Sequence, residues 1–84
     1  MNIPTMTPGH VSRRRVFQAV GRMHGTEITC EFADGYWTVQ RRDTFSLALF
    51  PLYFGPCEDV AVARYHKACE IRETAIETMR KLSN

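Results

Sequence analysis

Apolar and polar side chains alternate on both sides of Asp34-Gly35, and this is the clearest pattern in the chain. Residues 27–33 and 36–42 each alternate with a period of two, which is typical of half-buried β-strands. Asp and Gly tolerate the positive φ angles of a two-residue hairpin turn. The predicted pairs are Phe32 with Trp37, Cys30 with Val39, Ile28 with Arg41, Glu31 with Thr38, Thr29 with Gln40 and Glu27 with Arg42. The sequence therefore predicts a β-hairpin with one largely apolar face and one polar face.

A broad apolar stripe runs from Glu58 to Leu82 and predicts a long amphipathic helix. Gly55-Pro56 precedes it as a break, and Glu77 and Lys81 on the opposite face stand in the favourable i, i+4 order. At about 1.5 Å per residue this helix is roughly 40 Å long, whereas a short strand spans about 20 Å. Its C-terminal half therefore needs a cover beyond the sheet, from an earlier helix or from a second copy of the chain.

A second helix is predicted from Pro8 or Ser12 to His24. Thr7 and Pro8 have the form of an N-cap followed by proline at the first helical position. The apolar residues at helical spacing are Val16, Phe17, Val20 and Met23. Residues 1–6 show no periodicity and are predicted to form a mobile tail.

Residues 45–54, FSLALFPLYF, are apolar at eight of ten positions and predict a third strand. Pro51 cannot donate a ladder hydrogen bond, which favours the edge of a sheet or a break in the strand. Together these elements predict an α+β fold: an N-terminal helix, a three-stranded antiparallel sheet and the long C-terminal helix packed on one sheet face. Residues 7–84 are predicted to be a single domain, with no apolar run long enough to span a membrane.

The third strand also predicts an exposed apolar surface. A strand sends alternate residues to opposite faces, so its apolar side chains cannot all point inward. A helix, a second copy of the chain or another protein would cover the remainder. The residues predicted to bind a partner are Phe45, Leu47, Leu49, Phe50, Leu52 and Tyr53.

Positive charge is unevenly distributed within a net charge of +2. Residues 1–42 hold six basic and three acidic side chains, and residues 43–84 hold five and six. Arginines in the first turns of the predicted helix oppose its macrodipole, which indicates an acidic or phosphate-bearing partner; the alternative is a solvated basic face. The residues predicted to bind nucleic acid or an acidic surface are Arg13, Arg14, Arg15, Arg22, Gln40 and Arg42.

The run from Asp34 to Glu73 resembles the plant-type AP2 DNA-binding domain and the arm-binding domains of phage integrases. DGYWTVQRRD is similar to the second strand of that family, and YFGPCEDVAVARYHKACEIRE to its third-strand glycine and following helix. The resemblance implies a three-stranded sheet on one helix, with the open sheet face in a DNA major groove and Trp37, Arg41 and Arg42 as DNA contacts. The hairpin register instead turns Trp37 and Arg41 to the inner face.

The cysteines and histidines predict no cofactor. Cys30, Cys57 and Cys69 are odd in number and lack metal or redox spacing, which favours free thiols in a cytoplasmic, reducing compartment. His66 lies three residues before Cys69, but no second ligand pair stands at metal spacing. Catalytic motifs are also missing from the sequence, so no enzyme activity is predicted.

These observations predict a small non-enzymatic binding protein, an inhibitor or adaptor that docks on a nucleic-acid-handling protein complex of a host or phage, of the anti-CRISPR type. The alternative is an AP2-like DNA-binding regulator or recombination accessory factor, which would use the sheet and the basic N-terminal helix. A homodimer is compatible with both, and neither involves a membrane.

Overall fold

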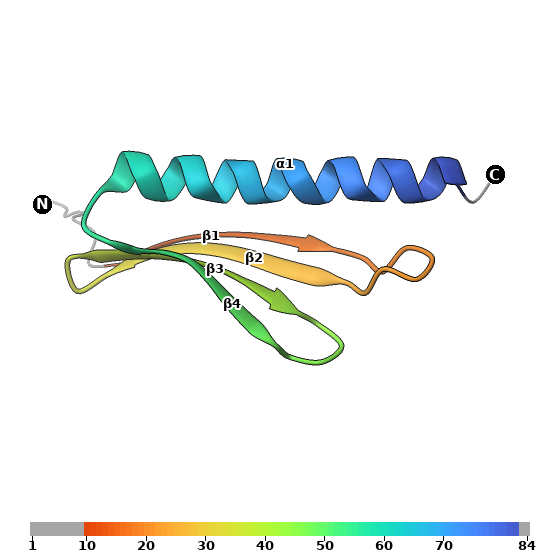
Figure 1. Cartoon of the computed structure of the whole chain (residues 1–84). Coiled ribbons are helices and arrows are strands. Elements are labelled where there is room, and N and C mark those ends of the chain that lie inside the picture. The colour runs from red at the N-terminus through yellow and green to blue at the C-terminus, as the bar shows by residue number, and fades with distance from the viewer. Residues whose placement is uncertain (1–9, 83–84) are drawn as a thin grey trace, which may run out of the picture.

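A computed structural model describes residues 10–82, in which four β-strands and one helix form two layers (Figure 1). The elements are β1 (His10–Phe17), β2 (Thr26–Ala33), β3 (Tyr36–Asp43), β4 (Leu49–Gly55) and α1 (Glu58–Leu82). The strands form one antiparallel sheet in the order β1-β2-β3-β4, and α1 packs on one of its faces. The α+β class, the antiparallel sheet and the C-terminal helix are confirmed, while the predicted number of three strands is wrong.

The hairpin at Asp34-Gly35 joins β2 to β3, and all six predicted pairs are present. Both turn residues are left-handed, with φ of 55° at Asp34 and 83° at Gly35, as a two-residue type I′ turn requires. The apolar face turns toward α1, where Ile28, Cys30 and Val39 are fully buried. The alternation in the sequence thus predicts both the register and the buried face.

The predicted N-terminal helix is wrong, because β1 occupies this region and pairs with β2 along its whole length. Val20 and Met23 were predicted to lie on the helix but instead face each other across a tight turn. Each backbone N–H donates to the other residue's carbonyl oxygen, at 3.0 and 2.9 Å. Gly21 has φ 59° in this turn, a conformation that Gly adopts without strain and that ends any helix. The tail predicted for residues 1–6 and the N-cap at Thr7 lie outside the described residues.

The strand predicted over residues 45–54 is β4, and it begins only at Leu49 because the preceding residues form the β3–β4 turn. β4 lies at an edge of the sheet, as Pro51 predicts. The pairing shifts between Val39 and Gln40, which face Tyr53 and Pro51, so Leu52 is an extra residue in the edge strand. Bulges bend a strand, and the far end of the β3–β4 hairpin curves away from α1 in Figure 1.

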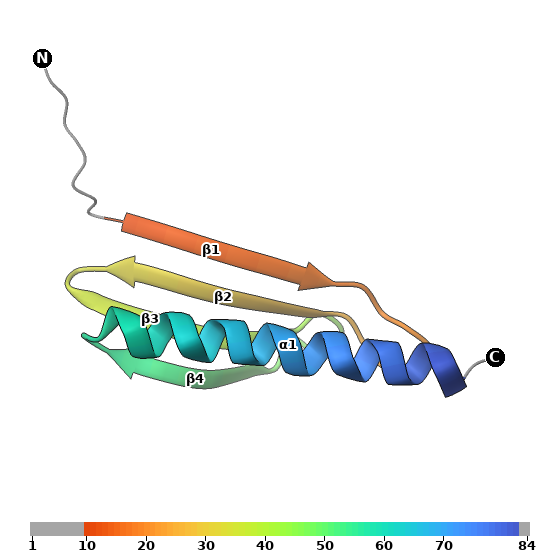
Figure 2. The same cartoon turned by 90° about the horizontal axis from the view of Figure 1, so that it is seen from above.

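The helix α1 covers β2, β3 and β4, while β1 lies mostly beyond its cover (Figure 2). Acidic Glu58 and Asp59 occupy its first turn and basic Arg80 and Lys81 its last turn, which complements the helix dipole at both ends. The buried helix residues and their partners form a single core. Its buried apolar members are Phe17, Ile28, Cys30, Trp37, Val39, Ala61, Tyr65, Cys69 and Ile76.

The C-terminal half of α1 extends past the strands at its last turns, and the β1–β2 connection supplies part of its cover (Figure 1). A methyl group at Gly21 would lie 3.2 Å from the Met79 side chain, so the tight turn lies against this end of the helix. The expectation that a helix earlier in the chain covers this half is therefore wrong, because a turn does so. Among the described residues, no helix has the length and apolar character needed to cross a membrane.

Candidate functional site

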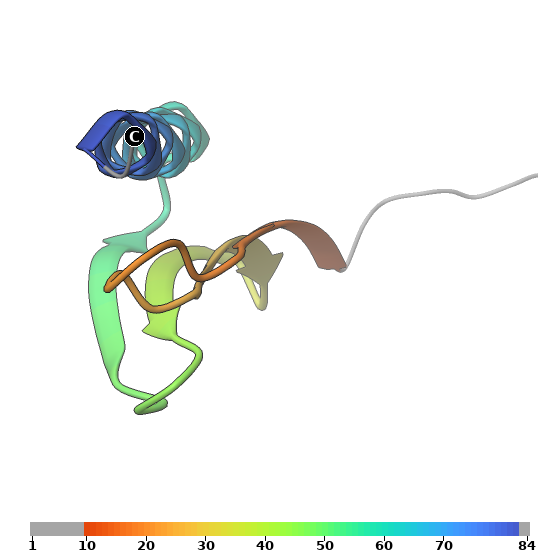
Figure 3. The same ribbon diagram turned by 90° about the vertical axis from the view of Figure 1, so that its right-hand side faces the viewer.

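Four of the exposed large apolar side chains gather at the β3–β4 hairpin, on its turn and the first residues of β4. Phe45 is 76% exposed, Leu47 67%, Leu49 48% and Phe50 42%. We call these four residues the hairpin surface. All four belong to the set predicted to bind a partner. The end-on view shows that this turn lies on the side of the sheet away from α1, where the helix does not reach it (Figure 3).

The turn that carries the hairpin surface is held by Asp43. One carboxylate oxygen, Oδ1, accepts hydrogen bonds from the backbone N–H groups of Phe45 and Ser46 at 2.8 and 3.1 Å. These two bonds hold the pKa of the Asp43 carboxyl below its ordinary value, because they stabilise the charged form. The Asp43 backbone also pairs with Ala48 and Leu47, at 2.9 and 2.8 Å. The apolar residues are therefore presented on an ordered turn.

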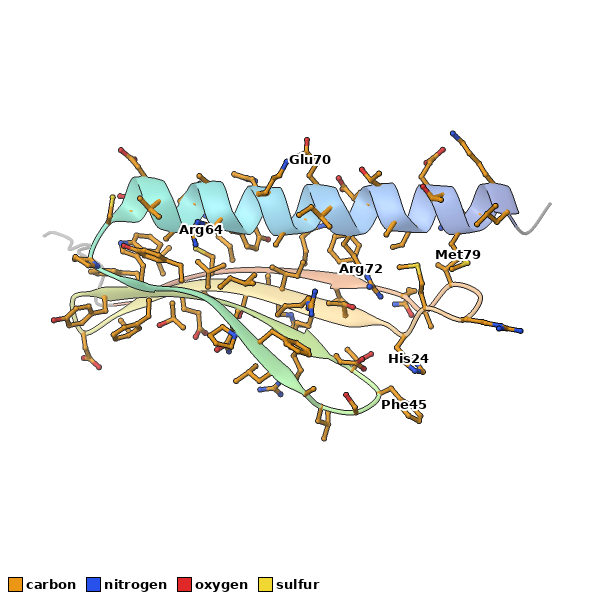
Figure 4. All side chains as sticks on the ribbon, viewed as in Figure 1. His24, Phe45, Arg64, Glu70, Arg72 and Met79 are labelled. Atoms are coloured by element: carbon orange, nitrogen blue, oxygen red, sulfur yellow. The ribbon has the colours of Figure 1, made fainter. Side chains whose placement is uncertain are left out.

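Leu47 adopts a left-handed conformation in this turn, with φ of 64°. This conformation brings Cβ close to the following carbonyl oxygen and costs a non-glycine residue about 1–2 kcal/mol. Asn and Gly adopt it more readily, so the local backbone favours either of them over Leu. Phe45 stacks on the His24 ring at 4.6 Å with an interplanar angle of 7°, which orients its ring (Figure 4).

Leu52 and Tyr53, also predicted to bind a partner, are only half exposed and pack against the core. The Tyr53 hydroxyl accepts a hydrogen bond from the Cys57 backbone N–H at 3.1 Å, just before α1 begins. The Leu52 carbonyl oxygen accepts one from Arg64 on α1 at 2.9 Å. These two residues therefore join β4 to the helix.

Two exposed aromatic residues lie outside the six residues predicted to bind a partner, although Phe54 belongs to the apolar run from which those six come. Tyr36 and Phe54 stack at 5.2 Å on the face of the sheet opposite α1 and are 48% and 69% exposed. The hairpin register contains the signal for Tyr36, since its neighbour Trp37 points inward and strand residues alternate. They extend the apolar area along the β3–β4 half of the open sheet face.

The predicted basic residues do not form one face. β1 pairs Arg13 and Arg15 with inward-facing residues of β2 and Arg14 with an outward-facing one, so the run is split between the two sides of the sheet. Arg14 lies 3.0 Å from Glu27 and Arg15 lies 2.8 Å from Glu73, so two of the three arginines have partners within the chain. Arg22 is exposed in the tight turn of the β1–β2 connection.

Gln40 and Arg42 lie on the open sheet face, where their pairing partners on β2 are Thr29 and Glu27. Glu31 is also on this face, so carboxylates interrupt its positive charge. Of the contacts implied by the AP2 resemblance, Trp37 is buried at 6% exposure and Arg41 points toward α1. Only Arg42 is exposed on the face that would meet DNA.

The cysteines are free, with Cys30 and Cys69 buried and Cys57 exposed. Burial raises the pKa of the Cys30 and Cys69 thiols, since it disfavours the thiolate. His66 is exposed while Cys69 is buried in the core. Within residues 10–82 no group of three potential ligands is placed to hold a metal ion.

Comparison with known proteins gives no match to a family model, to a curated protein or to a solved structure. The geometry of the hairpin surface and the charges around it are therefore the observations from which a function can be proposed.

Proposed function

We propose that this chain is a small non-enzymatic binding protein that docks on another protein through the hairpin surface. The groups gathered there are apolar side chains, which provide binding area and no acid, base or nucleophile. Exposed apolar residues that gather in one region of a small domain are typical of interaction sites. Phe54 and Tyr36 would form the continuation of the contact along the sheet.

The observation that carries the proposal is Leu47. Its side chain is 67% exposed and its backbone is left-handed, so neither burial nor conformation favours leucine at this position. Residues held in sparsely populated backbone conformations cluster at active sites and ligand-binding segments. Contact with an apolar pocket on a partner would give this leucine a role.

The finer form of the proposal is an inhibitor or adaptor of a nucleic-acid-handling complex. Its support comes from three of the exposed cations that form no ion pair within the described residues: Arg13, Arg22 and Arg42. Such charges would favour approach to an acidic or nucleic-acid-lined surface, and the hairpin surface would supply the affinity.

The test is affinity capture from a lysate of the native host with the tagged chain and its Leu47→Asn variant. Asn tolerates the left-handed conformation, so the variant should keep its fold and lose the captured protein. Leu82→Asn is the matched control, because Leu82 is 77% exposed at the far end of α1. The control should capture the same protein in the same amount as the original chain.

Nuclease treatment of the lysate separates the two kinds of partner. A protein that is captured equally with and without nuclease, and is lost only with Leu47→Asn, supports the proposal. Equal capture by Leu47→Asn and Leu82→Asn would remove the hairpin surface from the function.

The AP2-like alternative has one observation in its favour: within the described residues no element covers the sheet face opposite α1 (Figure 3). Its charge balance opposes this use, since Glu27 and Glu31 lie on the same face as Gln40 and Arg42. DNA binding by this face predicts that Arg42→Gln weakens a duplex gel shift whose affinity falls steeply with salt. A duplex that stays unbound at low salt would eliminate the alternative.

A further inference from the structure

Two arginines from different elements line an open cleft between α1 and the β3–β4 hairpin. The cleft has two adjoining hollows of about 150 and 180 Å³, and Arg41 and Arg72 line both. Figure 4 shows Arg72 pointing from α1 toward the sheet on the side of His24. The far end of the β3–β4 hairpin curves away from α1 beside this cleft (Figure 1).

Both guanidinium groups are held in position. One terminal nitrogen of Arg72 donates a hydrogen bond to the His24 carbonyl oxygen. The Nε–H group of Arg72 is buried and has no hydrogen-bond acceptor among the described residues. The Arg41 guanidinium lies over the Phe50 ring, 4.3 Å from the ring centre. In the described part of the chain neither arginine forms an ion pair. Cations that are fixed before binding lose little entropy when an anion arrives.

The charges in the cleft do not balance. Burial, and then the nearby charge of Arg41, lower the pKa of Arg72, which means that its charged form is destabilised here. Asp43 lines the second hollow, and its negative charge raises the pKa of Arg72. Its carboxylate also accepts hydrogen bonds from the β3–β4 turn. Two arginines against one carboxylate leave a single positive charge, which suits a monoanion better than a dianion.

The first hollow is apolar apart from the arginines. Its remaining lining is Leu52 from β4 with Ala68, Ile71 and Ala75 from α1. Ile71 is 59% exposed at the surface of the helix. A ligand whose anionic group meets the arginines would therefore place a short hydrocarbon segment against these side chains.

We infer that this cleft binds a carboxylate carried on a short apolar stem, with Arg41 and Arg72 holding the carboxylate. Planar guanidinium groups match carboxylates in geometry and form charge-assisted hydrogen bonds. A free small acid and the C-terminal residue of a polypeptide share this chemistry. The site is separate from the proposed docking role, although Phe50 borders both.

The test is a titration of the isotope-labelled chain with hexanoate, followed by NMR at the arginine Nε–H groups and backbone amides. Hexanoate should bind saturably and shift the signals of Arg41 and Arg72. Hexanamide, which has the same stem without the charge, should cause no saturable shift. Inorganic phosphate should bind more weakly than hexanoate, because it lacks the stem and carries more charge.

Arg41→Gln should weaken hexanoate binding by about tenfold or more, the effect of losing one charge-assisted contact. Arg13→Gln is the matched control, since Arg13 is an exposed arginine of β1 without an ion pair, and it should leave the affinity unchanged. Asp43→Asn should tighten binding, because the amide oxygen keeps an acceptor for the turn while the opposing charge is removed. This second variant tests the site even if Arg41→Gln does not fold.

A peptide ending in leucine with a free carboxylate, compared with its amide, separates the two sources. Binding of the free peptide assigns the site to polypeptide C-termini, and binding of hexanoate alone assigns it to small acids. Equal binding of hexanoate and hexanamide would overturn the inference, as would equal losses in Arg41→Gln and Arg13→Gln.

Discussion

Leu47 links the proposed docking role to the conformation of a single residue. The sequence places Leu47 among the residues predicted to bind a partner, but nothing in the run FSLALF indicates a left-handed leucine. That conformation follows from Asp43, whose carboxylate and carbonyl oxygens accept hydrogen bonds from the backbone N–H groups of the turn. Turn conformations of this kind depend on several hydrogen bonds at once, which is why composition alone does not predict them.

Replacing Leu47 with glycine should stabilise the fold. Glycine adopts the left-handed conformation without the steric cost, and part of the gain is lost to the greater freedom of the unfolded chain, which leaves about 0.5–1 kcal/mol. Chemical denaturation of Leu47→Gly measures this difference. The same change at Leu49, inside β4, should destabilise the fold, and a stabilised Leu49→Gly would contradict the strand assignment.

The turn should respond to pH through Asp43. Its pKa is lowered in the folded state, so its contribution to stability is present above the unfolded pKa of about 3.9 and is lost as the pH falls through the folded pKa. The original chain should melt at a higher temperature than Asp43→Asn at neutral pH, and the difference should disappear in acid. A difference that is constant from neutral pH to acid would contradict this role of the carboxylate.

At the scale of elements, the hairpin was predicted in full and the N-terminal element was not. β2 and β3 carry a long, strict alternation with a turn that has its own sequence signal. In β1 the apolar Val16 and Phe17 are adjacent, and with Val20 and Met23 they imitate a helical period by chance. The conflict between three arginines and a helix dipole was the available sign that this segment is a strand.

The tight turn at Gly21 should be required for the cover of α1. Gly21→Ala would place a methyl group on a left-handed residue and in close contact with Met79. It should therefore lower the free energy of unfolding by more than the about 1–2 kcal/mol that the left-handed conformation costs by itself. Gly35→Ala is the matched control, because Gly35 is also left-handed but has open space where the methyl group would lie. Equal losses of unfolding free energy in the two variants would show that the turn does not pack on the helix.

At the scale of the whole molecule, both edges of the sheet oppose self-pairing. β4 carries Pro51 and an extra residue at Leu52, and β1 carries three consecutive arginines that would face their own copies in an antiparallel pair. We therefore predict that the chain is a monomer over a wide concentration range, as measured by light scattering. A dimer that Leu47→Asn dissociates would assign the hairpin surface to self-association.

The helix α1 is too long for the sheet alone to cover, as its length in the sequence predicts. A helix of 25 residues exceeds strands of eight, so some other segment must cover its end. The β1–β2 connection does this, but a connection without periodic residues gives no advance sign of where it packs. The Arg41 and Arg72 cleft was missed for the same reason, because it depends on how far the hairpin bends from the helix.

The most direct test of the docking role is hydrogen exchange of the chain alone and in complex with the captured protein. Protection on binding should be concentrated at the β3–β4 turn and the start of β4, residues 44–50. Exchange along β1 should change little. Protection confined to β1, or spread over the open sheet face without the turn, would contradict the hairpin surface as the site of docking.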